Sequence, residues 1–179
     1  MGTREDLLAA AKQCLADRGY ARTTVRDIVA ASGTNLAAIN YHFGTRDKLL
    51  TQAMIESSAT AVQQILDTVA ADEPGDRLTE FLRRLVDSFT TDRAVWVANA
   101  ESYPQAIHTP ELRAELAAAQ ARARRGLAEL FGHDGDESVG ALLQTMIGGL
   151  LLQWLIDPEH APSPEQLVTG MRALARPPA

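Results

Sequence analysis

Side chains that donate hydrogen bonds or carry positive charge are concentrated between Thr24 and Lys48 of this 179-residue sequence. Hydroxyl, amide, phenol, imidazole and cationic groups alternate there with small apolar residues. Groups of these kinds contact phosphate oxygens and pair with the exposed edges of bases. The segment therefore predicts noncovalent recognition of a nucleic acid, without a bond-making step.

Signatures of catalysis are missing from the sequence. It has no glycine-rich phosphate-binding loop, no cysteine and histidine spacing typical of zinc, and no Gly-x-Ser-x-Gly motif. The four histidines are scattered along the chain: His42, His108, His133 and His160. His133 lies beside Asp134, where a polar loop is a better interpretation than a metal site. We expect no enzymatic activity, no cofactor and no bound metal.

Two short helices are expected to position the hydrogen-bonding side chains. The first should begin after Thr24, whose hydroxyl can accept from the free amides of the first turn, and end at Ser32-Gly33. Asn35 can cap the second, which carries apolar residues at helical spacing as far as Phe43. Two short helices joined by a glycine-containing turn form a helix-turn-helix, whose second helix can enter the major groove of DNA.

The stretch from Thr23 to Leu50, TTVRDIVAASGTNLAAINYHFGTRDKLL, resembles the DNA-binding segment of the tetracycline-repressor (TetR) family. The resemblance rests on residues at fixed spacing: Thr24, Ile28, Gly33, the Tyr41-His42-Phe43 run and Leu49-Leu50. Asn40 stands where the family commonly has an aromatic residue, and Arg46 where it often has lysine. The operator sequence therefore cannot be transferred from a relative.

The resemblance and the helical patterns together imply an all-α fold with two domains. An N-terminal three-helix helix-turn-helix DNA-binding domain is expected over residues 1–50, with the motif at 24–43. A long helix over 46–70, which Thr45 can cap, should join it to a C-terminal helical bundle, residues 51–179, for ligand binding and dimerisation. Asp72-Glu73-Pro74-Gly75 is the clearest break in the helical pattern.

The expected DNA contacts divide between base edges and phosphates. Asn40 could pair with adenine, while Leu36 or Ala37 could touch a thymine methyl group. The expected base contacts are Asn35, Leu36, Ala37 and Asn40, and the expected phosphate contacts are Thr24, Thr34, Tyr41, His42, Arg46 and Lys48. The alternative for the aromatic run that ends the second helix is packing onto its neighbours, which is the better interpretation for Phe43.

Net charge is unevenly distributed along the chain. Residues 1–50 hold seven basic and five acidic side chains, a net charge of +2. The remaining residues hold ten basic and eighteen acidic side chains, a net charge of −8, so the total is −6. Phosphate contacts need local positive charge only. The weakly basic N-terminal segment fits DNA binding that is strongly sensitive to salt.

Further helices are expected towards the end of the chain. A helix around Val95-Trp96-Val97 should be broken at Pro104, and another should begin at Thr109-Pro110. Asp136 can cap a strongly apolar helix, and Ser163 can open the last helix through a capping box.

The apolar helix over 141–156 needs covering on almost every side. Together with the final helix it could form the interface of a homodimer, which would hold two recognition helices about 34 Å apart. The expected interface residues are Leu143, Ile147, Leu151, Leu155, Leu167, Met171 and Leu174. Gly148-Gly149 indicates a close approach of another backbone or of a ligand, with close packing the better interpretation.

In the TetR family the C-terminal region holds an inducer pocket. The residues expected to line it combine aromatic walls with a few polar groups: Phe89, Trp96, Asn99, Tyr103, Met146, Leu150 and Trp154. The alternative for each of them is an ordinary place in the core. The acidic composition of this region favours a neutral or cationic ligand.

The resemblance implies a homodimeric transcriptional repressor that binds a palindromic double-stranded DNA operator and is released by an unknown small-molecule effector. A transcriptional activator and a ligand-independent regulator of the same fold are alternatives. Two rivals come from other classes of protein. One is a helical small-molecule-binding protein with a vestigial helix-turn-helix, and the other is an interaction module that uses the apolar helix.

Three features of the sequence bear on its location in the cell. They favour the cytoplasm and predict no membrane partner. Cys14 is the one cysteine, so no internal disulfide can form. The segment Met1–Asp6 lacks the apolar region of a signal peptide. The run Ala141–Ile156 is interrupted by polar residues and is shorter than the ~20 residues of a membrane span.

Overall fold

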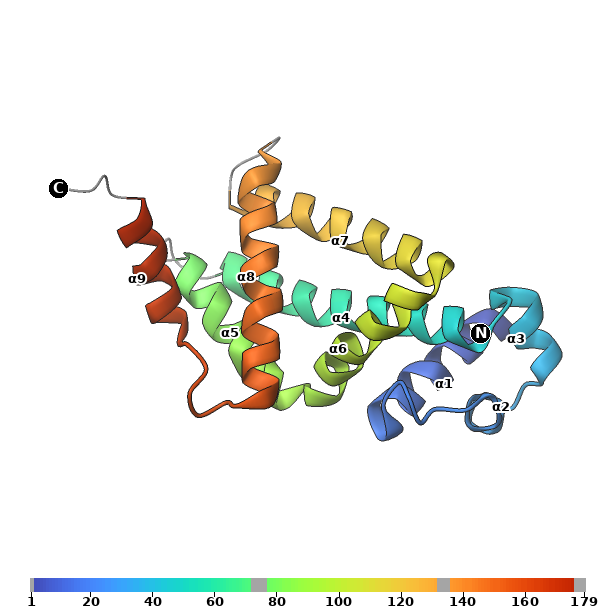
Figure 1. Ribbon diagram of the computed structural model, residues 1–179. Helices are drawn as coiled ribbons and strands as arrows, with labels where there is room; N and C mark the ends of the chain where they lie inside the picture. Colours follow the sequence, from blue (N-terminus) through green and yellow to red (C-terminus); the bar gives the residue numbers. More distant parts are fainter. Residues whose placement is uncertain (1, 72–76, 132–135, 176–179) are drawn as a thin grey trace. The chain divides into compact units, whose positions relative to one another are not determined.

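The computed structural model describes residues 2–71, 77–131 and 136–175, and within these ranges it contains helices and no β-strand. In chain order the helices of the described residues are α1 (Thr3–Arg18), α2 (Val25–Ser32), α3 (Leu36–Phe43), α4 (Arg46–Ala71), α5 (Arg77–Thr91), α6 (Arg93–His108), α7 (Pro110–Leu130), α8 (Glu137–Ile156) and α9 (Pro164–Leu174), as Figure 1 shows. The predicted all-α class is confirmed.

The chain divides into two compact units. Unit 1 comprises Met1–Thr60 and Arg93–Ala121, and unit 2 comprises Ala61–Asp92 and Arg122–Ala179. Unit 1 therefore contains α6 and the first part of α7 in addition to the segment 1–50. The expected break at Asp72–Gly75 lies outside the described residues.

The two helices of the predicted helix-turn-helix begin at the expected capping residues. The hydroxyl of Thr24 accepts from the amide of Asp27 at 3.3 Å, and the Asp27 carboxylate accepts from the amide of Thr24 at 2.7 Å. Asn35 Oδ1 accepts from the amide of Ala38 at 2.9 Å. Gly33 ends α2 with a φ of +66°, a conformation that glycine adopts without a steric cost.

Later helices also begin at predicted caps. Thr45 Oγ1 accepts from the amide of Lys48 at 3.1 Å, at the start of α4. Asp136 caps α8, and Ser163 caps α9 with proline at the first helical position. These starts depend on local hydrogen bonds, which is why the sequence alone predicts them.

The predicted break at Pro104 is wrong, because α6 continues from Arg93 to His108 with Pro104 inside it. A proline in a helix interior costs ~3 kcal/mol through the lost hydrogen bond and the ring clash. Here Pro104 is exposed, while Ser102 and Ala106 on either side of it are buried. Packing of one face of α6 therefore outweighs the local cost.

The core of unit 1 is built around α1. Its buried residues come from all the helices of the unit: Leu7, Leu8, Ala10, Ala11, Cys14, Leu15, Tyr20, Ile28, Ile39, Phe43, Leu49, Leu50, Ala53, Met54, Ala98, Ala106, Leu112 and Leu116. Both α2 and α3 contact α1, so each short helix is held by one buried face. This arrangement leaves the opposite face of α3 to solvent.

Unit 2 packs α8 and α9 against α5. The buried face of α5 carries Phe81, Leu82, Leu85 and Phe89. Each of these residues is at most 2% exposed. The helix therefore supplies the centre of this unit.

Close backbone packing in unit 2 occurs at Gly140 of α8. A Cβ atom there would lie 1.9 Å from the carbonyl oxygen of Arg124 on α7. The prediction that Gly148-Gly149 marks a close approach is not met within the subunit, because a Cβ at either position has no neighbour within 4 Å. The three glycines lie on one helix, and side-chain patterning does not tell which of them faces α7.

Within the described residues, α8 is the one helix whose length and composition would allow it to cross a membrane. It has 20 residues, because it begins four residues before the apolar run at Ala141. Only 22% of its 18-residue apolar window is buried in the subunit. The expectation that this segment is too short is therefore corrected, although length and composition alone are weak evidence for a membrane span.

Candidate DNA-binding interface

One face of α3 is exposed although it carries large side chains. Leu36 is 54% exposed and Tyr41 is 85% exposed. Ala37 and Asn40 are exposed on the same side of the helix. Exposed leucine and tyrosine next to an amide form a surface that can contact a partner.

The opposite face of α3 is fixed to unit 1. Ile39 and Phe43 are buried, and Ala38 is partly buried against the same core. His42 is half-buried, with its ring edge-on to both Tyr41 at 4.9 Å and Phe43 at 6.4 Å between centroids. The burial of Phe43 agrees with the interpretation that this residue packs onto its neighbours.

The side chains at the turn before α3 have local partners. The hydroxyls of Ser32 and Thr34 lie 2.7 Å apart. Asn35 is exposed, but its Oδ1 atom is engaged in capping α3. Its side-chain amide nitrogen and the amides of the first turn are the groups that can reach a phosphate here.

Arg46 is directed into its own subunit. Its Nε donates to the carbonyl oxygen of Thr23 at 2.6 Å, and its Nη2 donates to the carbonyl oxygen of Tyr20 at 2.7 Å. Its Nη1 pairs with the carboxylate of Asp47, and the guanidinium lies 5.7 Å from the centroid of the Tyr20 ring. The expected phosphate contact of Arg46 thus competes with three intramolecular partners.

Tyr20 is 1% exposed, and the sequence did not single it out as a functional residue. Its hydroxyl donates to the carbonyl oxygen of Asp47 at 3.2 Å and lies 2.9 Å from the hydroxyl of Thr51. Burial raises the pKa of this hydroxyl, and the hydrogen bond with Thr51 acts in the opposite direction. The α1–α2 connection is thereby joined to the start of α4.

Thr24 and Lys48 are placed differently from each other. Thr24 is exposed, and its hydroxyl also donates to the Asp27 carboxylate at 2.6 Å. Lys48 is half-buried. Burial raises the pKa of the Glu115 carboxyl on α7, and the charge of Lys48 acts in the opposite direction. Lys48 is therefore close enough to act electrostatically on a carboxylate of α7 and still keeps part of its surface in solvent.

Exposed cations that were not predicted as contacts surround the two helices. Arg22 and Arg26 are exposed at the start of α2. Arg4 is exposed at the start of α1, with its guanidinium 5.2 Å from the centroid of the Phe43 ring. The positive charge of residues 1–50 was the sequence signal for them, but it did not identify individual residues.

Asp27 adds negative charge close to this surface. The hydrogen bonds from the hydroxyl and the amide of Thr24 lower the pKa of the Asp27 carboxyl, and Arg18 contributes to the same shift. Arg18 Nη1 lies 3.2 Å from Asp27 Oδ1. The carboxylate is therefore ionised and engaged in capping.

The predicted ligand-binding residues are divided between the two units. Trp96, Asn99 and Tyr103 belong to unit 1, whereas Phe89, Met146, Leu150 and Trp154 belong to unit 2. Asn99 Nδ2 donates to Ser58 Oγ at 3.2 Å. The indole nitrogen of Trp154 is enclosed and has no hydrogen-bond partner among the described residues.

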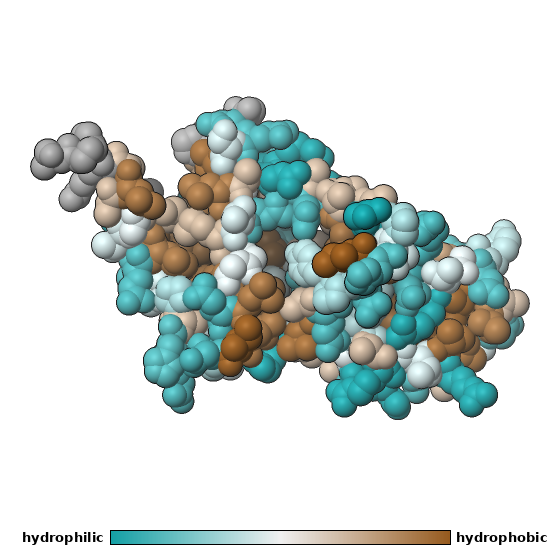
Figure 2. Space-filling view, viewed as in Figure 1, coloured by the Kyte–Doolittle hydropathy of each residue, from teal (hydrophilic) through white to brown (hydrophobic). Residues whose placement is uncertain are grey.

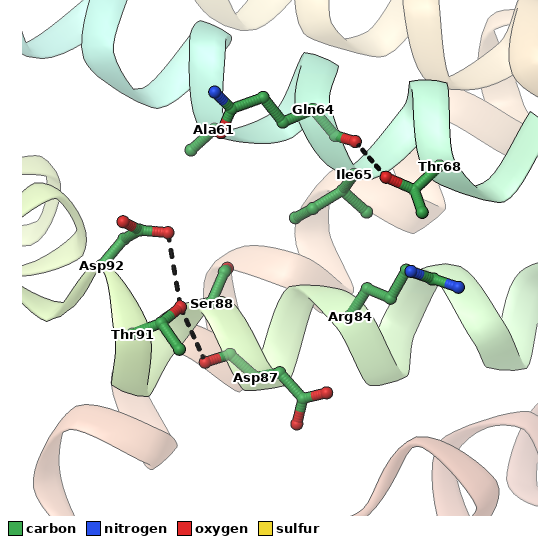
Figure 3. A pocket seen from close by; sticks show the side chains of 9 residues that line it. All are labelled: Ala61, Gln64, Ile65, Thr68, Arg84, Asp87, Ser88, Thr91 and Asp92. Carbon is green, nitrogen blue, oxygen red and sulfur yellow. Dashed lines mark hydrogen bonds between the residues drawn. The ribbon is translucent and has the colours of Figure 1, made fainter.

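A groove of about 300 Å³ lies between α4 and α5 in unit 2 (Figure 3). It is lined by Ala61, Gln64, Ile65, Thr68, Arg84, Asp87, Ser88, Thr91 and Asp92. None of the predicted ligand-binding residues lines it. In Figure 3, Ile65 projects from α4 towards α5, and the carboxylate of Asp87 turns away from α4. Arg84 Nε lies 2.7 Å from Glu80 Oε1, so its charge is partly neutralised.

The predicted dimer residues differ in exposure. Leu143 and Leu151 are each 4% exposed and belong to the core of their own subunit. Ile147, Leu155, Leu167 and Met171 are half-buried. Leu174 is 89% exposed.

A different face of α8 is open. It carries Ser138, Leu142, Thr145, Gly149, Leu152 and Ile156, which alternate at spacings of three and four residues and are all exposed. We call these six residues the α8 open face. Figure 2 shows apolar surface over the C-terminal end of α8. Among the described residues, no group of three or more His, Cys, Asp or Glu side chains is placed to hold a metal ion.

Models of known families match both parts of the chain. The model described as "Bacterial regulatory proteins, tetR family" matches residues 7–53. The model described as "Tetracyclin repressor-like, C-terminal domain" matches residues 73–177.

Curated relatives of the chain include transcriptional repressors. AcnR of Corynebacterium efficiens is 27% identical over 116 residues, which are 64% of this chain and 56% of AcnR. BepR of Brucella suis is 28% identical over 172 residues, which are 86% of this chain and 80% of BepR. The matched region thus spans little more than half the length of AcnR.

Solved structures share the fold along the whole chain. The multidrug binding protein EbrR in complex with imidazole has a TM-score of 0.76 at 22% identity, and the match covers 100% of this chain and 98% of EbrR. A TetR transcription regulator from Haloarcula marismortui has a TM-score of 0.67 at 24% identity, with 96% and 93% covered. At such identities the likeness concerns the fold.

Proposed function

Since this chain belongs to the TetR family of bacterial regulatory proteins, we propose that it is a repressor that binds a palindromic DNA operator as a homodimer and is released by a small-molecule effector. Membership in the family makes it a DNA-binding transcriptional regulator and not an enzyme. The repression, the dimer, the effector and a cytoplasmic location are the proposed part.

The observation that carries the proposal is the exposed face of α3. Asn40 stands at its centre, and a side-chain amide can pair bidentately with adenine in the major groove. Leu36 and Ala37 are placed on the same face to contact a thymine methyl group. We assign base contacts to these three residues and to Tyr41.

Phosphate contacts are assigned to the groups around the ends of α2 and α3. Thr24, Thr34, His42 and Lys48 keep the phosphate role predicted from the sequence. Asn35, which was predicted to reach a base edge, is assigned to a phosphate because its Oδ1 atom caps α3. Among the exposed cations, Arg4, Arg22 and Arg26 join them in the proposal. Arg46 is assigned a supporting role because its guanidinium already has three partners inside unit 1.

A second copy of the chain is the proposed occupant of the α8 open face. Spacings of three and four residues place its side chains in one stripe, as in helices that pack side by side. Thr145 and Gly149 are small, so another helix can approach closely at the middle of the stripe. We propose that α8 and the exposed part of α9, which includes Leu174, form a four-helix interface with the partner subunit.

We retain residues 1–50 as the proposed DNA-binding domain and 51–179 as the proposed ligand-binding and dimerisation domain. The effector is proposed to bind in unit 2. The groove between α4 and α5 and the enclosed indole N–H of Trp154 support this placement, since that N–H would donate to an acceptor on a ligand. To release the protein from its operator with a typical allosteric coupling, the ligand would have to stabilise the state that does not bind DNA by ~1–3 kcal/mol.

Selection of duplexes from a random-sequence DNA pool by the purified chain tests the proposal. We expect an inverted repeat whose half-sites lie about one helical turn apart, bound by two copies of the chain. Binding should weaken steeply as salt rises from ~50 to ~200 mM. Enrichment of no sequence, or of a single half-site bound by a monomer, would contradict the homodimeric repressor.

A further inference from the structure

Glu101 of α6 contacts the connection between α1 and α2, although the two are far apart in the sequence. Its Oε2 accepts a hydrogen bond from the amide of Tyr20 at 2.8 Å. Gly19, with a φ of +77°, makes room for the carboxylate, because a Cβ there would lie 3.1 Å from Oε2. All three residues belong to unit 1.

The polar groups of Tyr20 have partners on two helices of unit 1, α6 and α4. The amide donates to Glu101 of α6, the carbonyl oxygen accepts from Arg46 of α4, and the hydroxyl donates to the carbonyl oxygen of Asp47. The tyrosine is 1% exposed, so loss of the Glu101 carboxylate would leave its backbone amide buried without this partner.

These contacts join the two connections that flank the helix-turn-helix. The α1–α2 connection, residues 19–24, leads into α2, and the α3–α4 connection, residues 44–45, leads out of α3. Arg46, the first residue of α4, directly follows the second connection and donates to Tyr20 in the first. The helices α2 and α3 lie between these two linked residues in the chain.

Glu101 holds Tyr20 from outside the segment 1–50. The same helix is tied to α4 by Asn99, which donates to Ser58 Oγ. α6 thus contacts both the α1–α2 connection and the middle of α4 within unit 1.

We propose that Glu101 is a positioning residue for DNA recognition: its carboxylate fixes the backbone of Tyr20 and thereby the orientation of α2 and α3. The inference rests on the proposed function, since it concerns recognition of a specific duplex. Glu101 contacts no base and no phosphate in this account. Its effect on DNA is transmitted through Tyr20 and Arg46.

Substitutions at Glu101 separate positioning from charge. Removal of a negative charge from a DNA-binding unit raises affinity for DNA on electrostatic grounds alone. Glu101→Ala removes the charge and the acceptor, whereas Glu101→Gln removes the charge and keeps an acceptor of the same length. Glu101→Asp keeps the charge but shortens the side chain. Glu111→Ala, at an exposed glutamate of α7 in unit 1, is the matched control for charge.

The probe is the duplex selected from the random pool, and the second readout is hydrogen exchange of the Tyr20 amide without DNA. Positioning predicts that E101A and E101D weaken binding about tenfold or more and speed exchange of that amide by a similar factor. E101Q and E111A should bind as well as the wild type or slightly better. E101D keeps the charge and E101Q keeps the size of the side chain. The comparison of these two variants therefore tests the positioning role of Glu101 even if E101A does not fold.

Equal or tighter binding by E101A and E101D, with unchanged exchange at Tyr20, would overturn the inference. Failure of the proposed function is distinguishable from this result. If the wild type selects no duplex, the repressor is contradicted, and the exchange of the Tyr20 amide alone then decides whether Glu101 holds the α1–α2 connection.

Discussion

Arg46 Nη2 donates a 2.7 Å hydrogen bond to the carbonyl oxygen of Tyr20, 26 residues earlier in the chain. The same guanidinium donates to the carbonyl oxygen of Thr23 at 2.6 Å. One side chain thus joins the connection before α2 to the first residue of α4, and the recognition helix lies between them.

Replacement of Arg46 by lysine should reduce stability without changing the number of phosphate contacts. One ammonium cannot reproduce the planar set of donors that reaches two carbonyl oxygens and a carboxylate. We expect Arg46→Lys to lower the free energy of unfolding by ~1–3 kcal/mol in urea titrations. The slope of log affinity against log salt should stay that of the wild type.

Lys48→Ala is the matched comparison, because Lys48 is a proposed phosphate contact. It should reduce the salt slope by about 1. If Arg46→Lys instead reduced the slope of log affinity against log salt and left stability unchanged, Arg46 would be a phosphate contact and not a supporting residue.

Gly140→Ala should destabilise unit 2. Its Cβ would lie 1.9 Å from a backbone oxygen, so α7 and α8 would have to move apart. We expect a loss of ~1–3 kcal/mol by urea unfolding, the usual cost of overpacking. Gly126→Ala on α7 is the control, since a Cβ there has no neighbour within 4 Å, and it should gain up to ~1 kcal/mol of helix propensity. Equal effects at the two glycines would contradict the close packing.

Leu152→Glu should separate the proposed dimer. Leu152 is 51% exposed on the α8 open face, where the substitution would place like charges in the partner contact. We expect a monomer in sedimentation and affinity for the selected duplex lower by about 10²-fold or more. Ile107→Glu is the control, because Ile107 is 65% exposed and belongs to α6 and not to the α8 open face. A dimer that survives L152E would place the interface elsewhere.

Acid should weaken the cap of α2. The Asp27 carboxyl has a lowered pKa because of its hydrogen bonds with Thr24, so the unfolded chain binds the proton more readily than the folded one. Its contribution is therefore present above the ordinary aspartate pKa of ~3.9 and is lost as the pH falls through and below that value.

Stability measured from about pH 6 to pH 3 should fall less steeply in Asp27→Asn than in the wild type. Asp17→Asn on α1 serves as the control for removal of a carboxylate. An identical pH profile for D27N and the wild type would show that the Thr24–Asp27 capping box does not govern this range.

Local hydrogen bonds and helical spacing were enough to predict much of the fold. Thr24, Asn35 and Ser163 cap the helices that they were expected to cap, because a cap and its amide lie within three residues of each other. Pro104 was misjudged because burial of α6 on both sides of it outweighs the local cost of proline. The sequence around Pro104 shows the local cost of the proline but not the burial of α6 that outweighs it.

The site was predictable where it depends on one helix and not where it depends on distant contacts. The exposure of Asn40 and Tyr41 follows from the spacing of Ile39 and Phe43 on the buried face of α3. The Glu101–Tyr20 contact joins residues 81 positions apart, and no local pattern indicates it. Likewise, the apolar pattern of α8 is nearly uniform, so the face that remains open appears only when α5 and α7 are in place.

Recognition by α3 can be tested with an Asn40→Ala, Tyr41→Ala double variant, whose affinities for the selected duplex and for a scrambled duplex are compared with those of the wild type. We expect the wild type to prefer the selected duplex by about 10³-fold or more at physiological salt. The double variant should lose most of this preference while keeping its fold and its salt-dependent binding to scrambled DNA. A double variant that discriminates as well as the wild type would contradict recognition by the exposed face of α3.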